Sequence, residues 1–277
     1  MDTIDVTTLE KYIGVVTTLS EVGIHLWFRG VSSSDFGLVP GLVWKNDCEY
    51  ESRYVQKFLV GYRGYEKDQP NNPWNTYALM QHHGLPTRLL DWTRSPLLAL
   101  YFALTQDHEA ERTRSVWILP PYMLNRLTLG ADSVFCPGAY ENRVIDVFEY
   151  DSIDLDLYLP EALQPRMVRS MPKDPIAIEA PLFNNRIKSQ QGCFTVHGTS
   201  EKGIEELFAG VPRSLCRIDI PHGPGRFKLL EDLYKLGINE ETVFHNLDGL
   251  CARICREEMQ QQRLSVLFQR EANTVEP

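Results

Sequence analysis

The hydrophobic pattern near the start of the chain has the period of a helix. Apolar side chains recur every three or four positions from Leu9 to Leu19, and Thr7 and Glu10 before them have capping-box spacing. The apolar and aromatic residues between Tyr50 and Tyr62 repeat this pattern. We therefore predict two amphipathic helices, separated by a short strand over residues 24–28 and a loop rich in serine and glycine.

Further helices are predicted near Asn75 to Gly84, after Ser95 with a proline in the first turn, and from Leu250 to Phe268. Short apolar runs predict strands over residues 116–119, 176–178, 194–196 and 215–220, and residues 86–91 are expected to be extended. The acidic residues 146–158 are expected on the surface. No repeat and no linker interrupts the sequence, which predicts one α+β domain over residues 1–277, ending in a charged helix and tail at 256–277.

Composition agrees with a globular protein and excludes a coiled-coil rod or a disordered chain. Of the 277 residues, 43% are hydrophobic and 23% are charged. The 28 basic and 37 acidic side chains give a formal net charge of −9. A general affinity for nucleic acid through net charge is therefore not expected, although the composition is compatible with a local basic cleft.

The sequence carries no signal for a membrane or a metal. The longest apolar run, Leu97 to Leu104, is far shorter than the roughly 20 residues that span a bilayer. The first residues are acidic where a signal peptide is basic, so we expect a soluble cytoplasmic protein. Six scattered cysteines form no CxxC pair, which favours reduced thiols over a zinc site.

An arginine closes the first predicted strand. The run Trp27-Phe28-Arg29-Gly30 ends in a planar, permanently charged fork suited to a phosphate or a carboxylate. A surface arginine after an edge strand is the alternative.

A second, denser group of polar residues lies between two predicted helices in residues 77–103. Gly84 and Pro86 force a turn there, and the helix–turn–strand–turn–helix pattern predicts a cleft. Taken singly, Asp91 and Thr93 are also compatible with simple capping roles. The two adjacent histidines lack a partner at metal-ligand spacing, so no metal is expected. The polar candidates, with one tryptophan, are Gln81, His82, His83, Thr87, Arg88, Asp91, Trp92 and Thr93.

Two later segments are weaker candidates. Gln190 precedes a glycine and a predicted strand, where its amide either faces a ligand or belongs to a solvated turn. Residues 238–249 contain Glu240 and Glu241 before an apolar pair, and a helix-to-turn element that seals the core is the favoured interpretation.

At these places the sequence resembles the FRG-domain family, which takes its name from the triplet Phe28-Arg29-Gly30. The resemblance extends over roughly residues 20–255. Its other motifs are Gln81-His82-His83-Gly84, Thr87-Arg88-Leu89-Leu90-Asp91-Trp92-Thr93, Ser95-Pro96, Ala99 to Ala103, Arg186, Gln190, Gly192, Phe194, Gly237-Ile238, Val243-Phe244 and Asp248-Gly249. The family is named for a motif rather than an activity.

A more distant similarity is to ADP-ribosyltransferases of the arginine–serine–glutamate type. Arg29 matches their first element, and Leu90-Asp91-Trp92-Thr93 followed by Ala99 and Phe102 has the spacing of the second. This similarity implies a mixed, split β-sheet flanked by helices and NAD as substrate. Arg29 would bind phosphate, Thr93 would order the ribose and Asp91 would hold the second motif. The remaining residues expected at NAD are Gly30, Tyr77, Gln81, His82, His83, Thr87 and Trp92.

The third element of that type, an acidic motif before a late strand, is missing. Gln190-Gln191-Gly192 occupies a comparable place but offers an amide. We expect the catalytic acid to be Glu179, Glu241 or Asp91, because positive charge develops on the ribose when the glycosidic bond breaks.

The resemblances together predict an NAD-dependent ADP-ribosyltransferase that acts as a toxin or defence effector on a macromolecule, with a neutralising antitoxin protein as partner. The alternatives are a nucleic-acid- or protein-binding module without catalysis and an NAD glycohydrolase. A path for RNA or DNA, or else a solvated charged face, is expected at the basic residues Arg166, Arg169, Lys173, Arg186 and Lys188.

Overall fold

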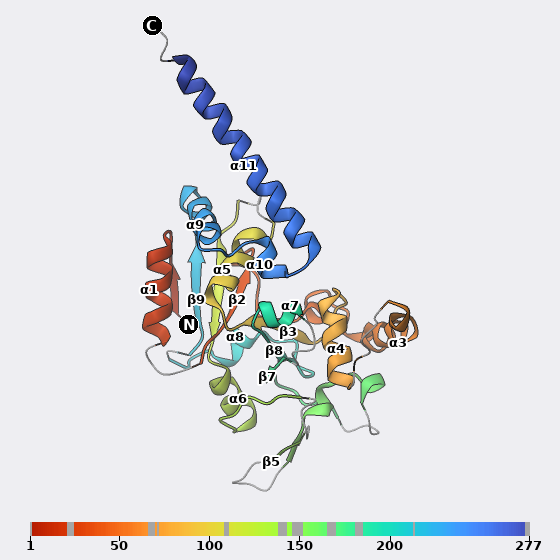
Figure 1. Ribbon diagram of the computed structural model, residues 1–277. Helices are drawn as coiled ribbons and strands as arrows, with labels where there is room; N and C mark the ends of the chain where they lie inside the picture. Colours follow the sequence, from red (N-terminus) through yellow and green to blue (C-terminus); the bar gives the residue numbers. More distant parts are fainter. Residues whose placement is uncertain are drawn as a thin grey trace.

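A seven-stranded mixed sheet forms the centre of the computed structural model, with helices on both faces (Figure 1). The structure describes residues 2–20, 25–65, 70, 72–107, 111–137, 143–145, 152–164, 170–180, 185–212 and 214–274. The strand order is β1-β9-β4-β2-β3-β8-β7, in which only β1 and β9 pair in parallel. The α+β class expected from the sequence is confirmed.

The strands are short and are separated by long helical segments. They are β1 (Asp2–Asp5), β2 (Trp27–Val31), β3 (Leu89–Thr93), β4 (Arg114–Leu119), β7 (Ile176–Glu179), β8 (Gly192–Val196) and β9 (Cys216–Ile220). A separate two-stranded sheet pairs β5 (Arg143–Ile145) with β6 (Ser152–Asp154).

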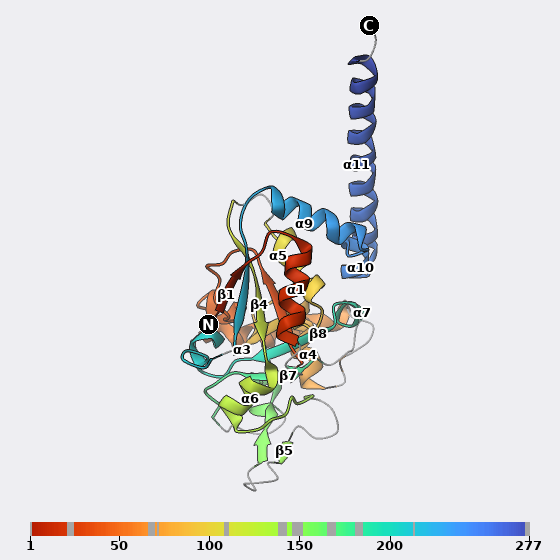
Figure 2. The ribbon, with the colours of Figure 1, turned by 90° about the vertical axis from the view of Figure 1, so that its left-hand side faces the viewer.

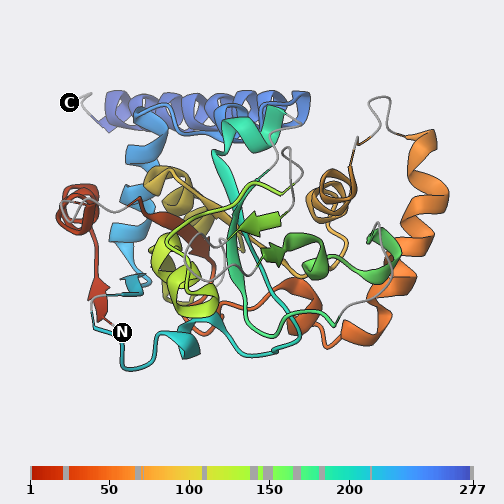
Figure 3. The same cartoon turned by 90° about the horizontal axis from the view of Figure 1, so that it is seen from below.

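Helices cover the two halves of the sheet separately. The helices of the structure are α1 (Leu9–Ser20), α2 (Gly41–Trp44), α3 (Glu51–Gly61), α4 (Pro73–His82), α5 (Pro96–Thr105), α6 (Pro121–Leu129), α7 (Asn185–Ser189), α8 (Ile204–Leu207), α9 (Pro224–Lys235), α10 (Glu240–Phe244) and α11 (Leu247–Thr274). α1, α5 and α9 pack on β2, β4 and β9. α3 and α4 pack on β3, β7 and β8, so α1 and α3 lie at opposite ends of the molecule (Figures 1 and 3).

The opposite face of the sheet is dominated by tryptophans. Trp27, Trp92 and Trp117 are buried there against α6, α8 and the chain around Leu38. The sheet therefore has cores on both faces, and its polar pocket lies where the two halves meet. α11 instead projects from the body (Figure 2).

Sequence patterns located most strands of the main sheet and several helices, but α6 and α9 were not expected. Helices α1, α3 and α5 match the predicted ranges, and the Ser95 hydroxyl caps α5 by accepting from the Leu98 amide. The strand expected over 24–28 begins at Trp27, and β1 was not expected because its four residues, Asp2–Asp5, are mostly polar. Residues 21–24 lie outside the described part.

The expectation that residues 146–158 lie on the surface is wrong where the structure describes them. Leu155 and Tyr158 are buried against α3 and α4, and the Tyr158 hydroxyl donates to the Asp174 carbonyl at 3.0 Å. The acidic side chains concealed the apolar positions of this short 3-10 turn. Residues 146–151 lie outside the described part.

Candidate functional site

A pocket opens where the two halves of the sheet separate. β2 and β3 share a single residue pair, Phe28 with Thr93, whereas β2 and β4 share five pairs and so do β3 and β8. The pocket of about 230 Å³ lies between β2, β3, β8, α4 and α5. Its lining residues are Phe28, Arg29, Gly30, Ala78, Gln81, His82, Asp91, Trp92, Thr93, Phe102, Gln106, Ile187, Gln190, Gly192, Cys193 and Phe194.

Arg29 reaches across this opening from β2. Its Nη1 donates to the Asp91 main-chain carbonyl at 2.8 Å, which fixes the guanidinium between the two halves of the sheet. The buried Nε has no hydrogen-bond partner among the described residues. Burial lowers the pKa of Arg29, and the charge of Asp91 opposes that effect. A guanidinium that lines a pocket is suited to bind an anion.

Gly30 is required because α5 packs directly on β2. A methyl group at this position would overlap the Ala99 carbonyl oxygen and would lie 2.6 Å from the Ala103 nitrogen. Backbone atoms cannot rotate away as side chains do, so the position accepts only glycine without a shift of the strand. Gly30 thus allows β2 to lie close to α5, which fixes the position of Arg29 in the pocket.

A chain of hydrogen bonds orients the carboxylate of Asp91. The Thr87 hydroxyl donates to Gln81 Oε1 at 2.6 Å, and Gln81 Nε2 then donates to Asp91 Oδ2 at 2.7 Å. The threonine hydroxyl in turn accepts from the Leu89 amide at 3.1 Å. Because the Gln81 amide oxygen accepts from Thr87 and the amide nitrogen donates to Asp91, the amide has one orientation. Asp91 is the one carboxylate among the described lining residues.

Thr93 connects β3 to the turn before β8. Its hydroxyl donates to the Gln190 carbonyl at 2.6 Å and accepts from the Ser95 amide at 3.0 Å. Gln190 Nε2 donates to the Val243 carbonyl at 3.3 Å. Gln191 has a φ of 48°, a left-handed conformation that is costly for a residue with a side chain. The turn is therefore held in place by Thr93 and α10.

Comparison with known proteins identifies the part of the chain that carries most of this geometry. Residues 24–112 match the family model of the FRG domain. The matched segment makes up about a third of the chain and is similar to the FRG domain. Neither the curated proteins nor the solved structures contain a match. The FRG match includes Arg29, Gln81, Asp91 and Thr93, whereas Gln190 lies beyond it.

The fold brings together most of the residues that were proposed from the sequence. Arg29, Gly30, Asp91 and Thr93 line the pocket, as do Gln81, His82, Trp92 and Gln190. Trp92 is buried and donates through Nε1 to the Thr195 hydroxyl at 3.0 Å, so its indole supports the wall. The aromatic surface of the pocket comes mainly from Phe28, Phe102 and Phe194.

Three of the residues that were expected at NAD do not line this pocket. Tyr77 is fully buried, donates to Glu51 Oε1 at 2.6 Å and accepts from the Arg88 amide, so its ring is not open for stacking. Thr87 is also buried and acts through Gln81. His83 lines a different cavity, although its ring lies 4.9 Å from that of His82.

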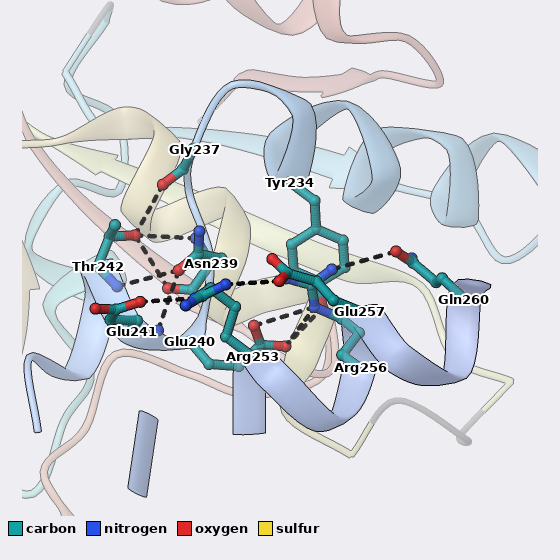
Figure 4. A network of polar contacts seen from close by, with 10 residues as sticks. All are labelled: Tyr234, Gly237, Asn239, Glu240, Glu241, Thr242, Arg253, Arg256, Glu257 and Gln260. Carbon is teal, nitrogen blue, oxygen red and sulfur yellow. Dashed lines mark hydrogen bonds and ion pairs between the residues drawn. The ribbon is translucent and has the colours of Figure 1, made fainter. Parts of the chain in front are cut away.

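Two of the three candidate acids lie outside the pocket. Glu179 at the end of β7 is ion-paired with Arg94. Glu241 on α10 accepts from Arg253 Nε at 2.6 Å, in a network that joins α10 to α11 (Figure 4). Spacing in the sequence could not reveal these basic partners. Asp91 is the candidate that the fold places in the pocket with Gln190.

The network around Glu240 explains why residues 238–249 looked like a sealing element. Arg256 Nε donates to both Glu240 oxygens at 3.0 and 3.1 Å, and its guanidinium lies 3.8 Å from the centroid of the Tyr234 ring (Figure 4). Val243 is buried beneath this layer. The segment anchors α11 and supports the Gln190 turn.

Other expectations concern metals, membranes and basic residues. No group of three or more His, Cys, Asp or Glu residues that could hold a metal occurs in the described part of the chain. No described helix is long and apolar enough to cross a membrane. Lys173 and Lys188 do not line the pocket. Arg166 and Arg169 lie outside the described residues, as does the side chain of Arg186.

The sequence analysis missed Gln106 and Ile187 as lining residues. Gln106 follows the last residue of α5, and its carbonyl accepts from Arg114. Ile187 lies on α7 and would contact a side chain placed at Gly192. Neither residue carries a sequence signal of its own, because their positions depend on how the helices pack.

Proposed function

We propose that this protein binds NAD between β2, β3 and β8 and transfers ADP-ribose from it to a macromolecule. One observation carries the proposal. The arginine of β2, the oriented carboxylate of β3 and the glutamine turn before β8 line one pocket. This is the combination that cleavage of a phosphorylated nucleoside requires, with an anion site on one side and a negative charge on the other.

In this proposal Arg29 binds the pyrophosphate of NAD and the pocket receives the nicotinamide end. A volume of about 230 Å³ suits one part of the dinucleotide, because pockets for whole drug-sized ligands are typically about 300–1,000 Å³. Phe28, Phe102 and Phe194 offer apolar surface to the nicotinamide ring. The rest of the dinucleotide extends out of the opening.

The reaction breaks the bond between nicotinamide and ribose. The bonding electrons leave with nicotinamide, positive charge develops on the ribose, and a nucleophile of the acceptor bonds to the anomeric carbon and releases its proton. The carboxylate of Asp91 stabilises that positive charge. Gln81 keeps the carboxylate aimed at the pocket through the 2.7 Å hydrogen bond.

The structure changes the role that we assign to Thr93. Both its donor and an acceptor site are used within the protein, on the Gln190 carbonyl and the Ser95 amide. We therefore assign it to positioning the Gln190 turn, and we assign contact with the ribose to the Gln190 side chain. A protein that modifies a cellular macromolecule in this way would be toxic, so the proposal includes a neutralising protein partner.

The test is incubation with NAD labelled in its adenylate part, together with cellular RNA, DNA and protein. We expect label in one of these fractions and free nicotinamide in solution. Arg29→Ala and Asp91→Asn should abolish both signals, while Glu241→Gln, outside the pocket, should keep them. Nicotinamide release without label would indicate an NAD glycohydrolase. Neither product would favour a binding module and overturn the proposal.

A further inference from the structure

A second cavity lies on the other side of α4. It has a volume of about 490 Å³ and is formed by α3, by the 3-10 turn Tyr62–Gly64 that follows it, and by α4. Its aromatic and basic lining residues are Lys57, Phe58, Tyr62, Tyr65 and His83. None of the roles assigned to the first pocket uses them.

Three aromatic rings line the cavity, two of them half-buried and one exposed. Phe58 and Tyr62 stack in parallel with centroids 5.0 Å apart. Tyr65 is 92% exposed. Tyrosine rings bury large areas when they bind a flat partner and lose little conformational entropy. A concave site walled by such rings is suited to a planar aromatic group.

Basic side chains lie along α3 and the turn after it, although the protein as a whole is acidic. The chain has a formal net charge of −9, yet the charged residues between Ser52 and Tyr65 are Arg53, Lys57 and Arg63. All three are exposed. The acid at the start of α3, Glu51, is buried and paired with Arg88 at 2.8 Å. Basic and aromatic side chains therefore alternate along this surface.

The cavity adjoins the first pocket through the end of α4. Gln81 and His82 line the first pocket, while Leu79 and His83 line the second. The rings of His82 and His83 are 4.9 Å apart and nearly perpendicular. A molecule held in the second cavity is therefore close to the proposed NAD site, because the adjacent residues His82 and His83 line one cavity each.

We propose that the second cavity holds an unstacked base of a single-stranded nucleic acid, and that this strand is the acceptor of ADP-ribose. The inference rests on the proposed function. Aromatic rings that stack on bases, combined with basic side chains that follow the phosphates, are how proteins hold single strands. A base inside a duplex is stacked and paired, so it cannot enter the cavity.

The test measures binding and transfer separately. Fluorescence anisotropy with a labelled single-stranded RNA, a single-stranded DNA and a duplex gives the Kd of each. We expect both or one of the single strands to bind more tightly than the duplex. Tyr65→Ala should raise the Kd at least about five-fold, since one stacked base is worth that much or more. Phe227→Ala, which removes an exposed aromatic ring on α9, should leave it unchanged.

The contribution of charge is measured by the salt dependence. Lys57→Ala should weaken binding and reduce the slope of log Kd against log salt by about 0.7, the value for one phosphate contact on a single strand. Lys11→Ala, which changes an exposed lysine on α1, is the matched control and should leave the slope as it is.

Transfer distinguishes failure of this inference from failure of the proposed function. We expect Tyr65→Ala to lose label on the oligonucleotide while it still releases nicotinamide from NAD, and Arg29→Ala to lose both while it still binds the strand. Label on protein alone would overturn the inference and leave the proposed function intact. Absence of single-strand binding, or equal binding of the duplex, would also overturn it.

Discussion

Replacing Gly30 by alanine tests whether close packing of β2 on α5 holds the pocket arginine in place. The added methyl group would lie 2.6 Å from the Ala103 nitrogen and 2.9 Å from the Ala99 carbonyl carbon, and it would overlap the Ala99 oxygen. β2 would have to move away from α5, although five residue pairs bind it to β4. Overpacking a core costs about 1–3 kcal/mol and sometimes more.

The cost at Gly30 should lie at or above the upper end of that range, because only backbone atoms meet the new methyl group. A loss of about 3 kcal/mol corresponds to a fall in Tm of about 6–12 °C for a chain of this size. Gly14→Ala is the matched control. Gly14 is an exposed interior residue of α1 with nothing within 4 Å of its new methyl group, so this change should stabilise by about 0.5–1 kcal/mol.

Thermal unfolding followed by circular dichroism measures both variants. The reasoning also predicts that Gly30→Ala weakens NAD binding below its melting temperature, because any movement of β2 carries Arg29 with it. A Gly30→Ala protein that melts within 2 °C of the wild type would refute this account of the packing.

Three further predictions follow from the same contacts. Asp91→Asn should lower the rate of nicotinamide release at least about 100-fold with little change in Tm, because the new amide oxygen still accepts from Gln81. Normal turnover by this variant, together with no turnover by Gln190→Ala, would assign the chemistry to the Gln190 amide instead. Arg29→Ala should cost at most about 3 kcal/mol of stability, measured by urea unfolding, since it removes one charged hydrogen bond, and Arg29→Lys should not restore NAD turnover because it lacks the fork. Burial lowers the pKa of His197 to about 3, so the unfolded chain takes up a proton below about pH 6.5 while the folded protein does not. The free energy of unfolding should therefore fall by about 2 kcal/mol from pH 7 to pH 5. Urea unfolding of His197→Gln at both pH values should show a smaller loss, and an equal loss would contradict the assignment.

The local features of the site were readable in the sequence. The Ser95 cap and the turn at Gly84 each follow from residue chemistry within a few positions. Arg29 was expected to end its strand, but it lies in the middle of β2, which continues to Val31. Arg29 and most of the polar residues from Gln81 to Thr93, which were expected at one site, line the same pocket and are joined by the hydrogen bond from Arg29 to the Asp91 carbonyl. Short-range patterns therefore located most of the pocket.

Pairing over long distances in the sequence decided the rest. Tyr77 looked available for stacking, but Glu51 and the Arg88 amide occupy its hydroxyl in the core. Glu241 looked like a free acid, but Arg253 lies one helix away and binds it. No periodicity or local motif contains such partners, because they meet only when α10 and α11, or α3 and α4, have packed.

A crystal structure with bound NAD, or with an analogue that cannot be cleaved, tests the central claim most directly. The account predicts a pyrophosphate oxygen within about 2.7–2.9 Å of the Arg29 guanidinium, with the anomeric carbon of the nicotinamide ribose facing the Asp91 carboxylate beside Gln190. Binding of NAD elsewhere on the protein, or an empty pocket at saturating NAD, would contradict it.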